Sequence, residues 1–459
     1  MDTLHKLNNK LSTTQVIALG FFCAIFIGAL LLMLPISSAD GHATSFINSL
    51  FTSTTSVCVT GLVVVPTFSH WSIFGKIVIL ILIQLGGLGI ISFTTGIMMI
   101  LGSRITLSDR ILLEDALNLD SLKGLVKFLR RIFKGTFIVE AIGAVCYSFV
   151  FIPDLGLIKG IAYSIFHSVS AFCNAGIDLL GNDSLIPYSC NLWINLVTMF
   201  LIISGGIGFI VWWDIINNVK KVWHHEFTLK KALRKLHIHS KIVIITTLLL
   251  IFIGAFLIFL LEYTNNNTIG KMNLPYKIIA SFFQSVTLRT AGFMTFPQSS
   301  LRSTSILVCL LLMFIGGSPI GTAGGVKTTT VSLLFLSTMA TIKGKHHLVV
   351  FKRTIPHRTV QKALAITVVS LSFLILATFI LHLTEGGSLL DATYEVTSAL
   401  ATVGLSRDFT SSLHFIGKVI IICCMYLGRI GPISMIIFFN RPHKGNNLLS
   451  YPHEDISVG

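Results

Sequence analysis

The sequence predicts an all-α integral membrane protein with eight transmembrane helices, arranged as four repeats of span, re-entrant loop and span. Three observations support this. Hydrophobic residues make up 53% of the chain and charged residues only 12%, with a mean hydropathy of +0.83, whereas charged residues are roughly 25% of an ordinary soluble domain. Runs with almost no charge are long enough to cross a bilayer. A short glycine pattern returns four times along the chain.

The repeated pattern is a pentapeptide with glycine at its fourth position. It reads CVTGL at Gly61, CNAGI at Gly176, RTAGF at Gly292 and ATVGL at Gly404. The glycines are 115, 116 and 112 residues apart, and an aromatic residue precedes each one by ten positions. The segment between aromatic and glycine is shorter than the about 20 residues that span a bilayer. We therefore expect a re-entrant half-helix followed by an extended loop in each repeat.

Apolar runs flank every loop and define the predicted spans. Before the loops they cover 11–39, 135–153, 242–261 and 363–384, and after the loops 77–102, 184–213, 303–341 and 419–440. The chain then divides into four repeats. These are residues 1–102, 103–216 with a cytoplasmic linker, 217–342 with a second linker, and 343–459 with a third linker and a C-terminal tail.

Lysine and arginine predict the orientation. Of the 34, we place 24 on the side of the termini and linkers, eight on the other side and two within spans. Basic loops face the cytoplasm, so we expect a multi-pass protein of the plasma membrane with both termini inside and the glycine loops entering from outside. This bias accounts for the net charge of +15, so we do not expect the protein to bind nucleic acid. Lysines next to membrane spans also favour anionic lipid.

Other function classes find little support in the sequence. Most of the eight cysteines lie in predicted spans and the histidine clusters stand among lysines, so we expect no disulfide framework or metal site. The stretch GTAGGVKT at 321–328 departs from the phosphate-binding loop at Val326 and follows no strand. No nucleophile, base and orienting residue group together, so we expect neither an enzyme nor an organic cofactor.

The glycine loops are the candidate ion path. Non-helical backbone at membrane depth is tolerated where it lines a water-filled cavity, and four such loops around one axis would surround a polar path. Backbone carbonyls can replace the water shell of potassium, and glycine permits the positive φ that this needs. The predicted potassium filter comprises Val59, Thr60, Gly61, Asn174, Ala175, Gly176, Thr290, Ala291, Gly292, Thr402, Val403 and Gly404. The alternative is that the glycines only allow tight helix packing.

The second span of the third repeat contains five glycines and Pro319 between residues 316 and 325, a composition that disfavours a straight helix. We expect an intramembrane loop over 316–330 with few helical hydrogen bonds; the alternative is a kinked packing helix. Lys327 and Arg429 interrupt the predicted spans, where ionisable residues are functional candidates. Buried arginine should face a cavity or bond to backbone carbonyls. The functional candidates of this region are Gly316, Gly317, Gly321, Gly324, Gly325, Lys327 and Arg429.

These features together resemble the Trk/Ktr/HKT superfamily of potassium transporters. The resemblance covers nearly the whole chain, through one filter glycine per repeat, GGSPIGTAGGVKTTT in the third repeat and an arginine in the last span. Eight spans without an additional N-terminal pair are most similar to the KtrB-type membrane subunits. The resemblance implies a pseudo-fourfold pore and potassium uptake through a channel-like subunit. It also implies that the glycine-rich loop obstructs the pore below the filter, that Arg429 lines the pore, and that the seven candidates of this region form the predicted gate. The alternative for Arg429 is a purely structural clamp on backbone carbonyls.

The resemblance also implies partners and selectivity. The partners are a second copy in a homodimer and a cytoplasmic ring of nucleotide-binding regulatory subunits of the KtrA type. In plant relatives a serine in place of the first filter glycine goes with sodium preference, so Gly61 favours potassium, while dependence on sodium stays open. The alternative function is a secondary symporter that couples potassium to sodium or protons, although such transporters usually have inverted repeats.

Overall fold

The computed structural model describes residues 13–100, 111–114, 124–181, 183–345 and 347–431. The described part is mostly helical, and its only strands are β1 (Val349–Val350) and β2 (Arg353–Thr354), which pair as a short antiparallel hairpin. The two chain ends lie outside the described residues, as do 101–102 and 432–440 of the predicted spans.

A long helix opens each repeat, as predicted. These helices are α2 (Thr13–Met33), α8 (Leu125–Leu155), α13 (Ile238–Glu262) and α17 (His357–Glu385). Within the described ranges they are the four single helices long and apolar enough to cross a membrane. Many of their large apolar side chains are exposed, which is the surface expected where helices face lipid.

A short helix follows in each repeat and ends at the predicted filter loop. These half-helices are α3 (Phe46–Val57), α9 (Leu157–Cys173), α14 (Leu274–Thr287) and α18 (Leu389–Leu400). In three repeats a buried serine of the half-helix donates a hydrogen bond to a backbone carbonyl of the long helix. The accepting residue stands three positions before a glycine of the long helix, and this glycine leaves room for the serine side chain. The bonds are Ser53 to Ile25 at 2.7 Å, Ser168 to Glu140 at 2.6 Å and Ser285 to Ile251 at 2.9 Å.

Three of the four second spans are each divided into two helices, a division that the sequence predicted only for the third repeat, and the fourth is described up to residue 431. The segments are α5 (Ile73–Leu88) and α6 (Ile90–Ile100), α10 (Leu192–Gly206) and α11 (Phe209–Trp223), α15 (Ser303–Phe314) and α16 (Thr328–Ile342), and α19 (Phe415–Ile430). The α10–α11 pair bends by 102° and adds a fifth candidate span if counted as one. Gly89 and Gly431 directly follow α5 and α19, and Gly208 directly precedes α11; in chain order these three glycines have φ of 81, 93 and 96° and ψ of 133, 138 and 132°. Glycine is the residue that adopts this backbone readily, which explains the breaks.

Short elements complete the connections. They are α4 (Thr67–His70), α12 (Leu229–Lys235) and the 3-10 turns η1 (Pro35–Ser37), η2 (Ile186–Tyr188), η3 (Gln298–Ser300) and η4 (Thr410–Ser412).

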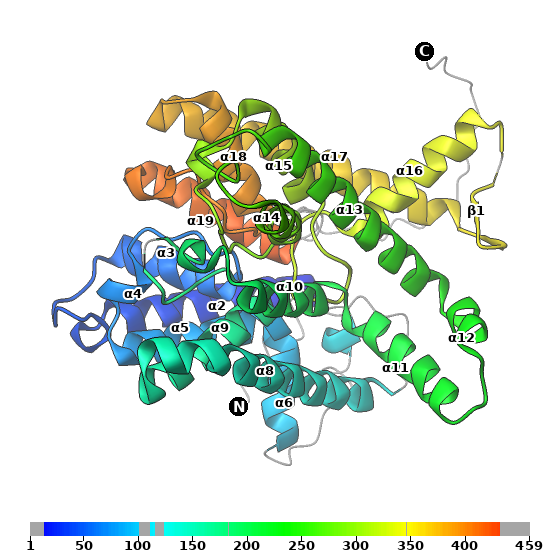
Figure 1. Ribbon diagram of the computed structural model, residues 1–459, viewed down its shortest axis with the longest axis horizontal. Coiled ribbons are helices and arrows are strands. Elements are labelled where there is room, and N and C mark those ends of the chain that lie inside the picture. Colours follow the sequence, from blue (N-terminus) through cyan, green and yellow to red (C-terminus); the bar gives the residue numbers. More distant parts are fainter. Residues whose placement is uncertain (1–12, 101–110, 115–123, 182, 346, 432–459) are drawn as a thin grey trace.

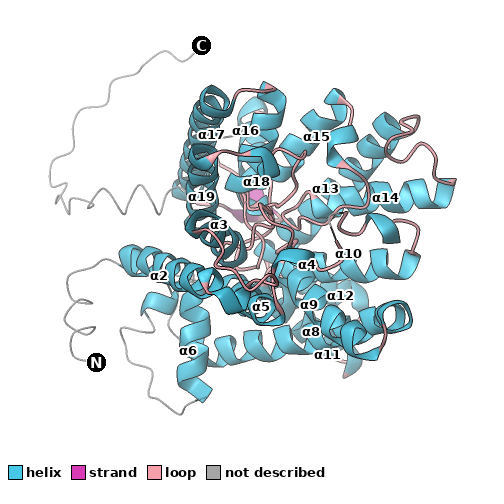
Figure 2. Ribbon diagram, turned by 90° about the vertical axis from the view of Figure 1, so that its left-hand side faces the viewer, coloured by secondary structure: helices cyan, strands magenta, loops and turns pink. Residues whose placement is uncertain are grey.

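The four repeats close into a ring. The second span of each repeat packs on the half-helix of the next one: α5 on α9, α10 on α14, α15 on α18, and α19 back on α3. Figure 1 shows the last repeat beside the first, and Figure 2 shows the loops gathered in the middle of the helices. This packing brings four segments that are more than 100 residues apart to one place.

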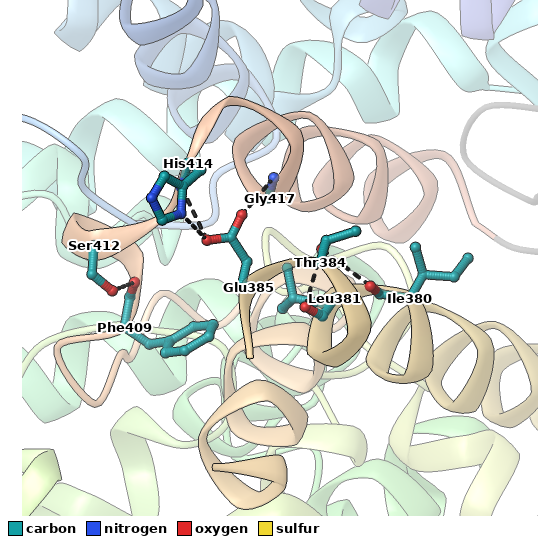
Figure 3. A network of polar contacts seen from close by, with 8 residues as sticks. All are labelled: Ile380, Leu381, Thr384, Glu385, Phe409, Ser412, His414 and Gly417. Carbon is teal, nitrogen blue, oxygen red and sulfur yellow. Dashed lines mark hydrogen bonds and ion pairs between the residues drawn. The ribbon is translucent and has the colours of Figure 1, made fainter. Parts of the chain in front are cut away.

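Carboxylates at the ends of the long helices α13 and α17 accept hydrogen bonds from the N-termini of α15 and α19, the second-span helices of the same repeats. Glu385 accepts from the amides of His414 and Gly417, both at 3.0 Å, and lies 2.9 Å from Nδ1 of His414 (Figure 3). Glu262 accepts from the amide of Arg302 at 3.1 Å and from the hydroxyl of Ser305. The first amides of a helix have no partner within the helix, so these carboxylates fix the register of α15 and α19.

Candidate ion filter and intramembrane loop

The four predicted filter loops meet in a closed cycle. Each glycine faces the carbonyl oxygen of the residue just before the next repeat's glycine. The pairs are Gly61 with Ala175, Gly176 with Ala291, Gly292 with Val403, and Gly404 with Thr60. A Cβ on Gly176 or Gly292 would lie 2.6 or 2.8 Å from its oxygen, and at the other two it would lie closer still. A side chain therefore cannot be added at any of the four without moving backbone.

The backbone alternates in hand through every loop. The four filter glycines have φ of 99, 65, 82 and 94° in chain order. The residues two positions earlier also have positive φ: Val59 at 56°, Asn174 at 60°, Thr290 at 70° and Thr402 at 52°. Positive φ is uncommon outside glycine, so its recurrence at one position in four repeats indicates a shared constraint. The residue between these two positions does not have positive φ in any of the four loops. A backbone that alternates between positive and negative φ in this way turns successive carbonyl groups toward the same side.

Hydroxyl groups of the half-helices hold the loops. Thr55 and Ser398 accept from the amides of Gly61 and Gly404 at 2.9 and 3.0 Å. Ser170 and Thr287 instead donate to the carbonyl after the glycine, at Ile177 and Phe293, with distances of 2.6 and 2.7 Å. All four hydroxyl-bearing residues are buried.

The filter loops also carry oxygen atoms without a protein partner. Thr60, Thr290 and Thr402 have buried hydroxyls that bond to none of the described residues. The loops therefore gather carbonyl and hydroxyl oxygens, and the twelve predicted filter residues include no charged side chain. Such an oxygen set suits a monovalent cation that gives up its water shell.

Residues 315–327 form the loop between α15 and α16, and we keep for it the predicted name, the intramembrane loop. The predicted end at residue 330 is corrected, because Thr328 already begins α16. The chain folds back on itself: the amides of Gly316 and Gly317 donate to Val326 and Gly324 at 3.0 and 3.2 Å. The stretch is thus a folded-back loop and not a kinked helix. The predicted gate glycines all lie within it.

The loop is tied to the break between α10 and α11. The amides of Ser318 and Thr322 donate to the carbonyls of Gly206 and Gly205 at 2.9 and 3.1 Å, and the amide of Phe209 donates to Ile320 at 2.8 Å. The expectation of few helical hydrogen bonds holds, but other backbone bonds replace them. These partners could not be predicted from the sequence, because they belong to another repeat.

Arg429 connects three repeats. Its Nη1 donates to the carbonyl of Thr322 in the loop at 2.8 Å, and its Nη2 donates to the carbonyl of Gly86 in α5. Lys327 donates to the carbonyl of Ala323 at 2.7 Å. The loop glycines 321, 324 and 325, Lys327 and Arg429 line one cavity of about 510 Å³. Arg429 therefore clamps carbonyls, and one of them, at Thr322, belongs to the loop that contains the predicted gate glycines.

A second internal repeat marks the breaks and was missed in the sequence. It reads LGGLG at 85–89, SGGIG at 204–208 and LGRIG at 427–431. A Cβ on its first glycine, at 86, 205 or 428, would collide with a carbonyl near the end of a half-helix. Its middle position is glycine at 87 and 206 but Arg429 in the last repeat. The pattern places the clamp arginine at the position where two other repeats have glycine.

Comparison with known proteins agrees with this geometry. The family model for TrkH, described as a cation transport protein, matches residues 6–451. The chain belongs to the TrkH family. It is similar to the potassium/sodium uptake protein NtpJ of Enterococcus hirae, with 39% identity over 99% of both chains. It is also similar to the Ktr system potassium uptake protein B of Bacillus subtilis, with 39% identity over 98% of this chain and 97% of that one.

A solved structure shows the same fold. The TrkH potassium transporter of Vibrio parahaemolyticus superposes with a TM-score of 0.73 at 18% identity, over 94% of this chain and 86% of that one. Membership of the TrkH family confirms the resemblance predicted from the sequence and makes this chain a cation transport protein rather than an enzyme. Together with the apolar helices, it indicates a multi-pass membrane protein.

Proposed function

We propose that this TrkH-family chain takes up potassium across the plasma membrane as the channel-like, conducting subunit of a Ktr-type system. The observation that carries the proposal is the closed cycle in which each filter glycine abuts a carbonyl of the next loop. The axis of this cycle is the ion path. Relatives at 39% identity are named as potassium uptake proteins.

The loops supply the chemistry that a potassium ion needs. Carbonyl oxygens from four loops replace water in the ion's first shell, and the unpaired hydroxyls of Thr60, Thr290 and Thr402 add further oxygens. The four loops differ in sequence, and Asn174 is the most polar departure. We therefore expect fewer uniform sites, and less strict selectivity, than in a filter built from four identical strands.

The loop at 315–327 and Arg429 form the gate in this proposal. The guanidinium repels cations on the path, and its bond to Thr322 keeps the loop below the filter. Three backbone hydrogen bonds hold the loop to the α10–α11 break, and each contributes about 1 kcal/mol net. Opening therefore costs about 3 kcal/mol from these bonds alone, which a regulatory partner has to offset.

The remaining parts of the proposal concern assembly and orientation. The chain forms a homodimer and binds a cytoplasmic ring of nucleotide-binding regulatory subunits of the KtrA type. The names of the relatives as components of Ktr systems support a multi-subunit assembly. Both termini face the cytoplasm, as the distribution of lysine and arginine predicts. No cofactor takes part, and potassium is the cargo.

Serine substitutions test the filter. Gly292→Ser adds a Cβ at 2.8 Å from the carbonyl oxygen of Val403, whereas Gly344→Ser adds one at φ of 63° in open space. Both variants carry the same kind of backbone strain, but only the first displaces a filter carbonyl. We expect Gly292→Ser, and serine at Gly61, Gly176 or Gly404, to lower the potassium-to-sodium flux ratio in proteoliposomes while Gly344→Ser preserves it. Wild-type potassium affinity in all four filter variants would contradict the proposal.

The second candidate is a symporter that couples potassium to sodium or protons. The relative from Enterococcus hirae is named as a potassium/sodium uptake protein, which favours a role for sodium. Potassium flux in proteoliposomes under separately imposed sodium, proton and voltage gradients distinguishes the two. A channel follows the potassium gradient and voltage alone, whereas a symporter accumulates potassium against its gradient when sodium or protons flow inward.

A further inference from the structure

The α11–α12 hairpin, residues 219–235, is strongly basic. It contains six lysine and arginine residues and one acid, Glu226. All six cations are exposed, and none forms an ion pair with a described residue. They are Lys220, Lys221, Lys230, Lys231, Arg234 and Lys235. In Figure 1 α12 lies at the right-hand edge, next to the start of α13.

Three of these lysines gather on one aromatic ring. The ammonium groups of Lys221, Lys231 and Lys235 lie 5.3, 4.8 and 4.7 Å from the ring centroid of Phe227. Phe227 is half-buried between the two helices. Ammonium groups held on one ring repel one another, and no described carboxylate pairs with them. An anionic group seated among them would remove that repulsion.

The same hairpin exposes a row of large apolar side chains. Trp223 is 82% exposed, Leu229 66%, Leu233 58% and Val219 53%. Val219 and Trp223 are four residues apart on α11, and Leu229 and Leu233 are four apart on α12, so each pair shares a helix face. Tryptophan and leucine beside lysines are the composition of helices that lie in a membrane interface.

We propose that the α11–α12 hairpin binds anionic phospholipid of the cytoplasmic leaflet. The lysines around Phe227 bind the phosphate-bearing headgroups, and Trp223, Leu229 and Leu233 enter the boundary between headgroups and acyl chains. Clusters of four to eight basic residues at a membrane-spanning helix favour such lipids, and α13 begins at Ile238, three residues after the hairpin. An acidic protein surface would satisfy the lysines but would leave the apolar row without a partner.

The hairpin is connected to the intramembrane loop. Helix α11 begins at Phe209, whose amide bonds to Ile320 of the loop at 2.8 Å, and it ends in the hairpin. Lipid that holds the hairpin in place therefore also influences the position of the loop. An effect of lipid on gating rests on the proposed function, whereas lipid binding to the hairpin does not.

Native mass spectrometry of the full chain in detergent tests the binding. Phosphatidylglycerol and phosphatidylcholine are added separately, and retained lipids are counted for the wild type and for Lys221→Gln/Lys231→Gln/Lys235→Gln. The matched control, Lys343→Gln/Lys345→Gln/Lys352→Gln, removes the same charge from exposed lysines on the same predicted side. We expect the hairpin variant to lose at least fivefold in phosphatidylglycerol retention, and the control and phosphatidylcholine retention to stay near wild type. Equal loss in both triple variants, or no loss in either, overturns the proposal.

Two further measurements separate the remaining outcomes. In vesicles that contain brominated phosphatidylglycerol, tryptophan quenching should fall in Trp223→Phe relative to the wild type; unchanged quenching counts against insertion of the hairpin. If the hairpin variant keeps phosphatidylglycerol but no longer co-purifies with a soluble Ktr regulatory subunit, the surface docks protein and the lipid proposal fails. These readouts do not depend on ion flux, so failure of the proposed transport activity would leave them interpretable.

Discussion

The amide of Phe209 donates a hydrogen bond to the carbonyl oxygen of Ile320 at 2.8 Å. The two residues are 111 positions apart, one at the start of α11 and the other in the intramembrane loop. Because proline is tolerated at the first position of a helix, this bond can be removed without disturbing α11.

Replacing Phe209 by proline should loosen the loop. Proline removes the amide donor and the aromatic side chain, whereas alanine removes only the side chain and serves as the control. Loss of one hydrogen bond of about 1 kcal/mol shifts an equilibrium about fivefold. We expect potassium flux through the purified chain alone to rise several-fold in Phe209→Pro relative to Phe209→Ala. Equal flux in the two variants would show that the bond does not restrain the gate.

Arg429→Ala should raise basal flux in the absence of any regulatory subunit. The change removes the guanidinium from the cavity and releases both Thr322 and Gly86. Shortening the loop between Gly321 and Gly325 should act in the same direction, and Arg353→Ala, an exposed arginine of β2, is the control. Potassium flux in proteoliposomes that contain each purified variant checks this. Low flux in both gate variants, with folding and selectivity retained, would make the loop and Arg429 packing elements.

Glu262→Ala should destabilise the protein. Besides Arg302 and Ser305, the buried carboxylate accepts from Asn265 and Thr268, each at 2.7 Å. Its loss leaves these donors without their acceptor, and we expect about 3 kcal/mol lower stability. Thermal unfolding in detergent measures the change. Glu226→Ala, at an exposed acid of the hairpin, should unfold near the wild-type temperature, and equal midpoints for both variants would refute the capping role.

Gly205→Ala should lower stability because its Cβ would collide with the carbonyl of Phe172 and lie 2.7 Å from Oγ1 of Thr322. The same change at Gly86 or Gly428 meets a half-helix carbonyl as well. Gly20→Ala in α2 is the control, since its Cβ would have ordinary contact with Ile90 at 3.7 Å, and alanine favours a helix by about 1 kcal/mol over glycine. We expect reduced thermal midpoints for the first three and an unchanged or higher one for Gly20→Ala.

Local sequence patterns were sufficient for much of the fold. The long first spans follow from unbroken hydrophobicity, and the half-helices follow from segments too short to cross a bilayer. The recurrence of glycine at 61, 176, 292 and 404 predicted which residues meet, and the structure places them in one cycle. Composition also predicted that residues 316–325 leave the helical conformation, because five glycines and a proline disfavour it within the segment itself.

The tertiary structure decided what these residues contact. The bonds of the loop to Gly205 and Gly206 and the carbonyl partners of Arg429 depend on repeats that meet through space. A backbone carbonyl has the same chemistry in every residue, so a sequence shows that Arg429 needs acceptors but not which carbonyls supply them. Only the closure of α19 on α3 brings those oxygens within reach.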